Sequence, residues 1–152
     1  MDIHLNKLNY RFAKKPLLVG GKAMEYYKLR PSGKDIDLIA DEQDVIALIK
    51  KYSNRVKNLY SDLGVCPFEF EIRRTINLFT YDELKTDALE EKNFLIISLE
   101  KLLIMKSLVI NVEKYKIDVE LIAQHILDTQ SKKSDTQKKD IEKLIENIEN
   151  IT

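Results

Sequence analysis

The sequence LLVGGKAMEYYKLRPSGKDIDLIA, from Leu17 to Ala40, sets the architecture of this chain. It begins with the apolar residues 17–19, which meet two glycines in a pattern typical of a buried strand that ends in a tight turn. Residues 22–29 then favour a short helix, which the Pro-Ser-Gly sequence at residues 31–33 ends. This order of strand, glycine turn, helix and loop predicts an α/β unit.

The strand predicted at residues 35–39 carries two carboxylates. Side chains of a strand alternate between its faces, so Asp35 and Asp37 share one face while Ile36 and Leu38 point into the core. Carboxylates held side by side tend to raise each other's pKa unless a cation lies between them. Mg²⁺ suits such a place because it takes hard oxygen ligands, usually one or two protein carboxylates together with substrate phosphates.

The glycine turn complements these carboxylates. A backbone without side chains approaches a phosphate closely, so Gly20 and Gly21 suit a phosphate cradle, to which Lys22 adds a positive charge. Metal-binding carboxylates next to a phosphate cradle indicate phosphoryl or nucleotidyl transfer. The competing interpretation is a glycine turn that is only a turn, with two solvated aspartates at the end of a strand.

The order of these features resembles the nucleotidyltransferase superfamily that includes DNA polymerase beta. Two glycines, a spacer of about a dozen residues and an Asp-Ile-Asp strand carry the resemblance. More narrowly, the pattern is similar to small bacterial members, among them the nucleotidyltransferase toxins of abortive-infection type systems. The resemblance implies that the glycine turn holds the triphosphate of an NTP, and that Asp35 and Asp37 bind Mg²⁺ or Mn²⁺. It also implies a third carboxylate on a neighbouring strand.

At this third carboxylate the sequence departs from the family. In family members the second of two neighbouring strands reads apolar-Asp-apolar, and the matching strand here, residues 75–80, has Asn77 at that position. An asparagine offers a neutral oxygen to a metal or hydrogen-bonds a substrate hydroxyl, but it cannot act as a general base. The alternatives are Glu69 and Glu71, on the strand predicted at residues 68–72, although both also fit a solvated outer face.

A second group of candidate residues follows in two helices. The stretch from Ile97 to Lys106 resembles the family's Ser-Leu-Glu start of a helix that carries a lysine. A lysine in so apolar a helix needs a partner or a ligand anion, unless it extends to the surface. The resemblance implies that the next helix contributes a basic residue and an aspartate to substrate binding. Two registers match, Lys114 with Asp118 or, alternatively, Lys116 with Glu120.

Apolar spacing predicts the remaining elements. Asp41 and Ser98 are each expected to cap a helix, and the polar residues 129–136 indicate a loop. The last helix has apolar residues at helical spacing and either closes the core or pairs with another subunit. A short helix is predicted within residues 1–15, and longer helices at residues 41–52, 99–110, 113–128 and 135–150. A further helical turn is predicted within residues 53–64 and a strand at residues 94–97.

The composition is that of a soluble globular protein, and 152 residues suit one domain. The formal net charge is zero, so nothing global marks a nucleic-acid binder. The single cysteine, Cys66, excludes an internal disulfide and fits a reducing cytoplasm, and no apolar stretch reaches the length of a membrane span. We therefore expect a cytoplasmic α/β (α+β) protein. A small mixed sheet core is expected in residues 1–96, and a helical part, residues 97–152, in the same compact unit.

Three functional hypotheses follow. The first is an enzyme that moves a nucleoside monophosphate from an NTP to an acceptor hydroxyl of RNA or tRNA, a protein or a small molecule, as a toxin-type nucleotidyltransferase does. The second is a nucleotidyltransferase-fold protein that has lost catalysis, which Asn77 favours, and that binds nucleotide, RNA or protein. The third is an interaction module whose last helix contacts an antitoxin or a second copy of the chain.

Overall fold

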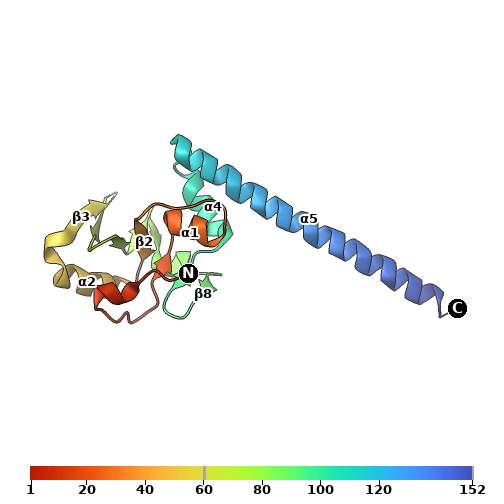
Figure 1. Cartoon of the computed structure of the whole chain (residues 1–152), viewed down its shortest axis with the longest axis horizontal. Coiled ribbons are helices and arrows are strands. Elements are labelled where there is room, and N and C mark those ends of the chain that lie inside the picture. Colours follow the sequence, from red (N-terminus) through yellow and green to blue (C-terminus); the bar gives the residue numbers. More distant parts are fainter. Residues whose placement is uncertain (60, 152) are drawn as a thin grey trace.

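A mixed sheet of seven strands forms the centre of the protein in the computed structural model, which describes residues 1–59 and 61–151 (Figure 1). The strand order is β3-β4-β5-β2-β1-β9-β8, with β2 parallel to β5 and antiparallel to β1. Together with the helices, this sheet confirms the predicted α/β class. The strands are β1 Leu17–Leu18, β2 Ile36–Ile39, β3 Val56–Leu59, β4 Asp62–Val65, β5 Phe70–Arg73, β8 Leu89–Glu90 and β9 Leu95–Ile96.

Helices cover both faces of the sheet (Figure 1). One hydrophobic core lies between the sheet and α2, together with the N-terminal segment. The other core lies between the sheet and α1, α3, α4 and the first turns of α5. The helices are η1 Leu5–Leu8, α1 Gly20–Tyr26, α2 Glu42–Lys51, η2 Ser53–Arg55, α3 Tyr81–Leu84, α4 Leu99–Ser107 and α5 Glu113–Glu149, where η marks a 3-10 helix.

Strand β2 distributes its side chains between these two cores. Ile36 and Leu38 are buried in the core under α2, as their alternation predicts. Ile39 is buried on the opposite side, and Asp37 is half-buried there. The face that carries Asp37 is therefore the face covered by α1, α4 and α5.

Local capping signals start the helices where the sequence predicts. Asp41 accepts a hydrogen bond from the backbone N–H of Gln43 at 3.3 Å, and α2 begins after it. Ser98 accepts one from the N–H of Lys101 at 3.2 Å, and α4 follows. Each cap satisfies a backbone donor that the helix itself leaves without a partner. Both predicted caps are confirmed.

The predicted helical turn within residues 53–64 is wrong beyond η2. The chain instead forms the β3–β4 hairpin, and β4 extends the sheet beside β5. Gly64 permits close packing in this hairpin, because a Cβ at that position would lie 2.3 Å from the Leu59 side chain. The apolar residues of this segment have helical spacing, but pairing across the sheet is a tertiary effect that overrides it.

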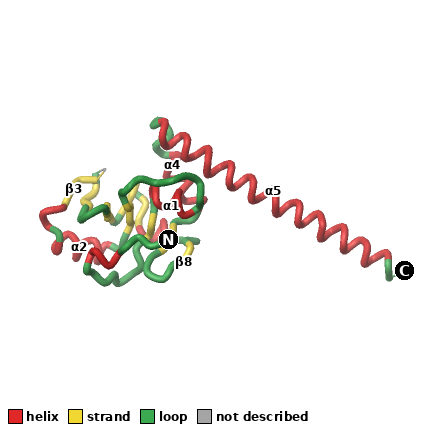
Figure 2. The backbone as a smooth tube through the Cα atoms, viewed as in Figure 1, coloured by secondary structure: helices red, strands yellow, loops and turns green. Residues whose placement is uncertain are grey.

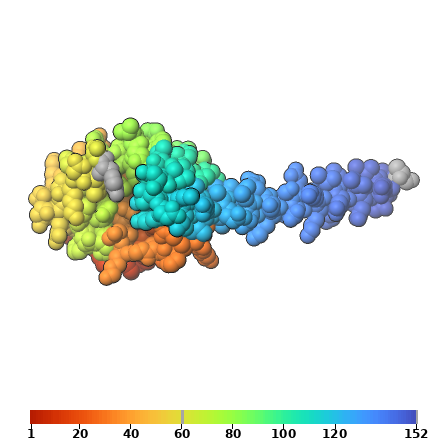
Figure 3. Space-filling model, turned by 90° about the horizontal axis from the view of Figure 1, so that it is seen from above, coloured from red at the N-terminus to blue at the C-terminus, as the bar shows by residue number. Residues whose placement is uncertain are grey.

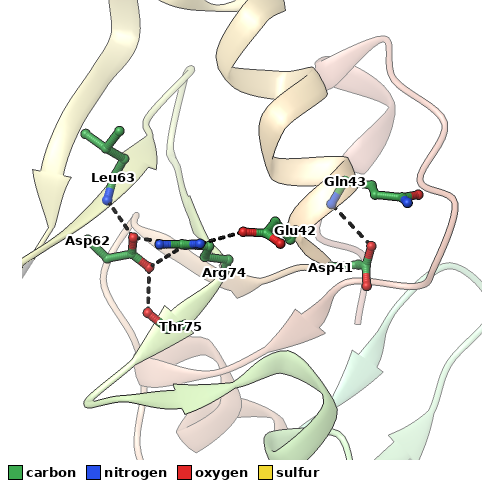
Figure 4. Close-up of polar contacts among 7 residues, drawn as sticks. All are labelled: Asp41, Glu42, Gln43, Asp62, Leu63, Arg74 and Thr75. Atoms are coloured by element: carbon green, nitrogen blue, oxygen red, sulfur yellow. Dashed lines mark hydrogen bonds and ion pairs between the residues drawn. The ribbon is translucent and has the colours of Figure 1, made fainter.

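A carboxylate in β4 ties this hairpin to the chain that follows β5. Asp62 accepts hydrogen bonds from the Thr75 hydroxyl at 2.5 Å and from Arg74 Nε at 3.1 Å (Figure 4). Arg74 also forms an ion pair with Glu42 at the start of α2. Burial by itself would raise the pKa of Asp62, but the hydrogen bonds from Thr75 and Arg74 hold that pKa below its usual range. This network fixes the position of residues 74 and 75.

The C-terminal part contains one long helix, so the loop predicted at residues 129–136 is wrong. The helix α5 continues through it for 37 residues in all. The helix contains no glycine or proline. Thr129 and Thr136 donate their hydroxyl hydrogen bonds to backbone carbonyls one turn earlier in the same helix. Polar side chains that indicate a loop are therefore compatible with an unbroken helix here.

Only the first turns of α5 join the body of the protein. Ile122 is fully buried, whereas residues 127–150 are exposed throughout. Figure 2 shows the helix leaving the body, and the space-filling view in Figure 3 shows no other element beside its far half. The exposed half of α5 therefore lies outside both hydrophobic cores.

Two other predicted helices are present in the structure. The short helix predicted within residues 1–15 is the 3-10 helix η1, and the helix predicted at residues 99–110 ends at Ser107. The latter is also not buried on all sides, because Ile104 is 50% exposed. Among the described residues, no helix combines the length and the apolar content that crossing a membrane requires.

Candidate active site

A cavity of about 620 Å³ lies where the sheet, the glycine turn and the corner between α4 and α5 meet. This volume is within the range of small-molecule sites, roughly 300–1,000 Å³. The cavity is lined by most of the residues that the sequence singled out. These are Gly20, Gly21, Asp35, Asp37, Asn77, Lys106, Lys114 and Asp118, joined by Arg30, Glu71, Arg73 and Tyr115.

Two carboxylates lie side by side in this cavity. Asp37 of β2 is paired directly with Glu71 of β5, and both strands run in the same direction. Burial, followed by the negative charge of Glu71, raises the pKa of Asp37 to about 6, although the charges of Arg73 and Lys106 act in the opposite direction. Asp35, at the start of the same strand, is exposed at the rim. The site thus concentrates negative charge at one point of its wall.

Glu71 occupies the place that the sequence analysis gave to Asn77. Parallel pairing of β2 with β5 brings Glu71 next to Asp37, whereas Asn77 lies on neither strand. Glu69, the other alternative, forms an ion pair with Lys7 at 2.5 Å and does not line the cavity. The alternation of residues 68–72 shows that Glu69 and Glu71 share a face. It does not show which of them lies beside Asp37, because that depends on the register in which the two strands pair.

Asn77 lies at the tip of a small hairpin, so the strand predicted at residues 75–80 is wrong. Its two arms are β6 (Thr75–Ile76) and β7 (Phe79–Thr80). Asn77 and Leu78 have φ angles of 48° and 69°, which place both in the left-handed region that two-residue hairpin turns require. Asn is one of the residues that tolerate this region well. The Asn77 side chain remains on the cavity lining, but away from the position of an acid on β5.

Gly20 brings the backbone of the turn against Asp37. Its φ is +65°, and a Cβ at this position would lie 2.2 Å from Asp37 Oδ2. Only glycine fits such a contact, for both steric and conformational reasons. At Gly21 a Cβ would be in ordinary contact with Ser32 at 3.5 Å, so the second glycine is not required by space. The close approach predicted for the turn is therefore carried by Gly20.

The structure does not bring Lys22 to this cavity. Its ammonium pairs with Glu25 at 3.2 Å and lies along a second hollow, of about 420 Å³, on the other side of the turn. Hydrogen bonds from Ser32 and Lys22 lower the pKa of Glu25. Lys22 is thus placed away from the residues that sequence analysis grouped with it.

A buried ionic cluster forms the basic part of the cavity. Asp118 of α5 is 1% exposed and accepts hydrogen bonds from Arg30 Nε at 2.5 Å and Nη2 at 2.8 Å. It also pairs with the ammonium of Lys106 of α4 at 2.9 Å. Two cations therefore share one carboxylate, which leaves net positive charge at the cavity wall. Arg30 was missed in the sequence because nothing in its own neighbourhood relates it to α5.

The first turn of α5 adds Lys114 and Tyr115 to the lining. The ammonium of Lys106 lies 4.8 Å from the centre of the Tyr115 ring, and that of Lys114 lies 5.1 Å from it. Such cation–π contacts hold the cations near the ring face. Of the two registers left open by the sequence, Lys114 with Asp118 is the one on the cavity, since Lys116 and Glu120 are exposed and do not line it.

Comparison of the chain with protein-family models, with characterised proteins and with solved structures found no match.

The carboxylate pair fits a divalent cation by its donor chemistry. Asp37 and Glu71 supply hard oxygens from two adjacent strands, and their mutual repulsion is what a bound cation relieves. Among the described residues, no group of three or more His, Cys, Asp or Glu side chains forms a metal centre by itself. Mg²⁺ does not need one, because it commonly uses one or two carboxylates and completes its shell with water and substrate phosphates.

The raised pKa of Asp37 leads to a prediction about stability. An unfolded aspartate titrates near pH 4, whereas Asp37 in the fold titrates at about 6. Between these values the native state binds more protons, so the free energy of unfolding falls as pH rises through this window. Asp37→Asn removes that loss. In metal-free buffer we expect the stability of the variant relative to wild type to increase by on the order of 2 kcal/mol between about pH 4 and pH 7.

Urea unfolding of both proteins at several pH values measures this difference. Asp35→Asn is the matched control, because Asp35 lies two residues before Asp37, immediately ahead of β2, and is exposed. Its stability relative to wild type is expected to change little over the same range. A difference for Asp37→Asn that stays constant with pH would contradict the prediction.

Proposed function

We propose that the protein is a divalent-metal-dependent nucleotidyltransferase, which moves a nucleoside monophosphate from an NTP to an acceptor hydroxyl. The observation that carries the proposal is the Asp37–Glu71 carboxylate pair, which lies against the backbone of Gly20 in the same cavity as a buried cluster with net positive charge. A cation and a triphosphate are complementary to these two kinds of wall. The acceptor is the hydroxyl of an RNA, a protein or a small molecule.

The chain's own groups have distinct roles in this proposal. Arg30 and Lys106 face the negative charge of the triphosphate, and Asp118 holds both of them in place. Gly20 allows the chain to approach the phosphates without a side chain between. A Mg²⁺ or Mn²⁺ ion held by Asp37 and Glu71, with Asp35 at the rim, would neutralise charge on the phosphates and lower the pKa of the acceptor hydroxyl.

The reaction is a displacement at phosphorus. The acceptor oxygen forms a bond to the α-phosphorus while the bond from that phosphorus to the bridging oxygen of the β-phosphate breaks, and pyrophosphate leaves. The acceptor proton passes to the carboxylate pair.

Label transfer tests the proposal. The protein is incubated with each α-labelled NTP, Mg²⁺ or Mn²⁺, and total RNA with cell proteins, beside the Asp35→Ala, Asp37→Ala double variant. We expect label to enter one class of acceptor only with the intact protein and only when a divalent cation is present. Equal labelling by the double variant, or no labelling of any acceptor by the intact protein, would refute the proposal.

The alternative of a fold kept only for binding loses its main support. It rested on Asn77 at the acid position, whereas Glu71 lies beside Asp37. The predicted partner contact by the last helix remains a prediction. Its apolar residues Ile141, Leu144, Ile145 and Ile148 are each 50–57% exposed, as a surface that binds another protein would be.

A further inference from the structure

Asn77 lines the cavity but has no role in the proposed nucleotidyl transfer. It lies on the hairpin after β5 rather than beside Asp37, and its side chain is exposed at the cavity mouth. Within the described part of the chain, its amide has no hydrogen-bond partner. One donor group and one acceptor oxygen are therefore open to a ligand that enters the cavity.

The hairpin holds this amide at a defined place. Its first arm is anchored by the hydrogen bond from the Thr75 hydroxyl to Asp62, in the network of Figure 4. Its second arm ends at Thr80, which forms a capping box with Glu83 at the start of α3. Between these anchors only four residues remain, so the turn has little freedom to move Asn77 away from the cavity.

The lining of this cavity also has an aliphatic part. Ile76 precedes Asn77 on the hairpin, and Met105, Val109 and Ile117 come from the corner between α4 and α5. These aliphatic side chains offer nothing to a phosphate. They suit the flat, apolar faces of a nucleobase, whose polar atoms lie along its edge.

We propose that this apolar part of the cavity, with Asn77 at its mouth, is the nucleobase subsite, and that Asn77 determines which NTP is used. The inference rests on the proposed function and adds base selection to it. An amide pairs with a base edge that has a donor beside an acceptor, and in DNA recognition asparagine makes this bidentate contact with N6 and N7 of adenine. ATP is therefore the expected substrate.

The experiment measures equilibrium binding of ATP, GTP, CTP and UTP with Mg²⁺, by calorimetry, to wild type and to Asn77→Gly. Glycine favours the same left-handed turn, so this variant removes the amide and keeps the hairpin. Leu78→Asn is the matched control, since it changes the adjacent turn residue, which is 94% exposed and does not line the cavity. Circular dichroism and thermal unfolding verify that both variants are folded.

We expect wild type and Leu78→Asn to bind ATP more tightly than the other three triphosphates. In Asn77→Gly the ratio of the Kd values of the other triphosphates to that of ATP is expected to fall about tenfold, while all four still bind. An unchanged preference in Asn77→Gly, or equal binding of all four by wild type, would overturn the role of Asn77 and leave the transferase proposal intact. If wild type prefers another base and Asn77→Gly abolishes that preference, Asn77 still selects the base, but the choice of adenine is overturned. If no NTP binds to wild type, both proposals fail.

Discussion

Glu71→Gln is expected to reduce nucleotidyl transfer by at least about 100-fold, the loss typical of removing a proton-transferring group. The glutamine has the same size and keeps the position beside Asp37, but it lacks the charge that holds a cation and accepts a proton. Initial rates of label transfer to the identified acceptor measure the loss. The pH dependence of stability in metal-free buffer provides a second readout, because Glu71 is one of the two main influences that raise the pKa of Asp37.

The matched comparison is Asn77→Gly assayed with the preferred NTP, for which we expect a loss of about tenfold or less. This pair of variants tests whether the third polar group of the reaction is Glu71, as the structure indicates, or Asn77, as the sequence predicts. If Glu71→Gln retains most of its activity while Asn77→Gly loses more than 100-fold, the third polar group of the reaction is Asn77 after all.

Asp118→Asn is expected to destabilise the protein by about 3–5 kcal/mol, as does the removal of one partner from other buried ion pairs. The substitution keeps the shape of the side chain, but it leaves the cations of Arg30 and Lys106 without their counter-charge. The Lys106 side chain is only 8% exposed, so its charge has no route to full solvation without local rearrangement. Urea unfolding at neutral pH measures the change in the free energy of unfolding.

A double-mutant cycle shows whether the loss comes from the stranded charge. Adding Lys106→Met to Asp118→Asn removes one of the two cations, and we expect it to recover part of the stability. Asp128→Asn is the matched control on the same helix, because Asp128 is exposed and, among the described residues, accepts a hydrogen bond from its helix neighbour Gln124. A loss below 1 kcal/mol for Asp118→Asn would show that solvent reaches the cluster.

Features that depend on neighbouring residues were predictable from the sequence. The apolar run, the two glycines and the Asp-Ile-Asp strand gave the order of β1, α1 and β2, and the caps at Asp41 and Ser98 gave the starts of α2 and α4. Alternation along β2 also placed Asp37 on the opposite face from Ile36 and Leu38. Each of these rests on interactions within a few residues of the chain.

Features that depend on distant pairing were not predictable. Glu71 is next to Asp37 because β5 joins β2 in one particular register, and a shift of one residue would have turned it to the other face. Arg30 and Asp118 are 88 residues apart in the sequence, and no local pattern around either residue indicates that they form an ion pair. Asn77 was assigned to a strand because its neighbours match the apolar-Asp-apolar strand of the family, and its turn contains no glycine, the usual marker of left-handed backbone, that would have indicated otherwise.

The exposed half of α5 is a long arm that is continuous with the wall of the cavity. Its first turns carry Lys114, Tyr115 and Asp118 on the wall of the cavity, and the rest projects into solvent as a straight arm (Figure 1). At 1.5 Å per residue this arm is roughly 35 Å long, so a tilt of about 5° at its base moves the tip by roughly 3 Å. Because Asp118 and the arm belong to one unbroken helix, a rigid tilt of that helix would displace both, and the displacement at the tip would be the larger.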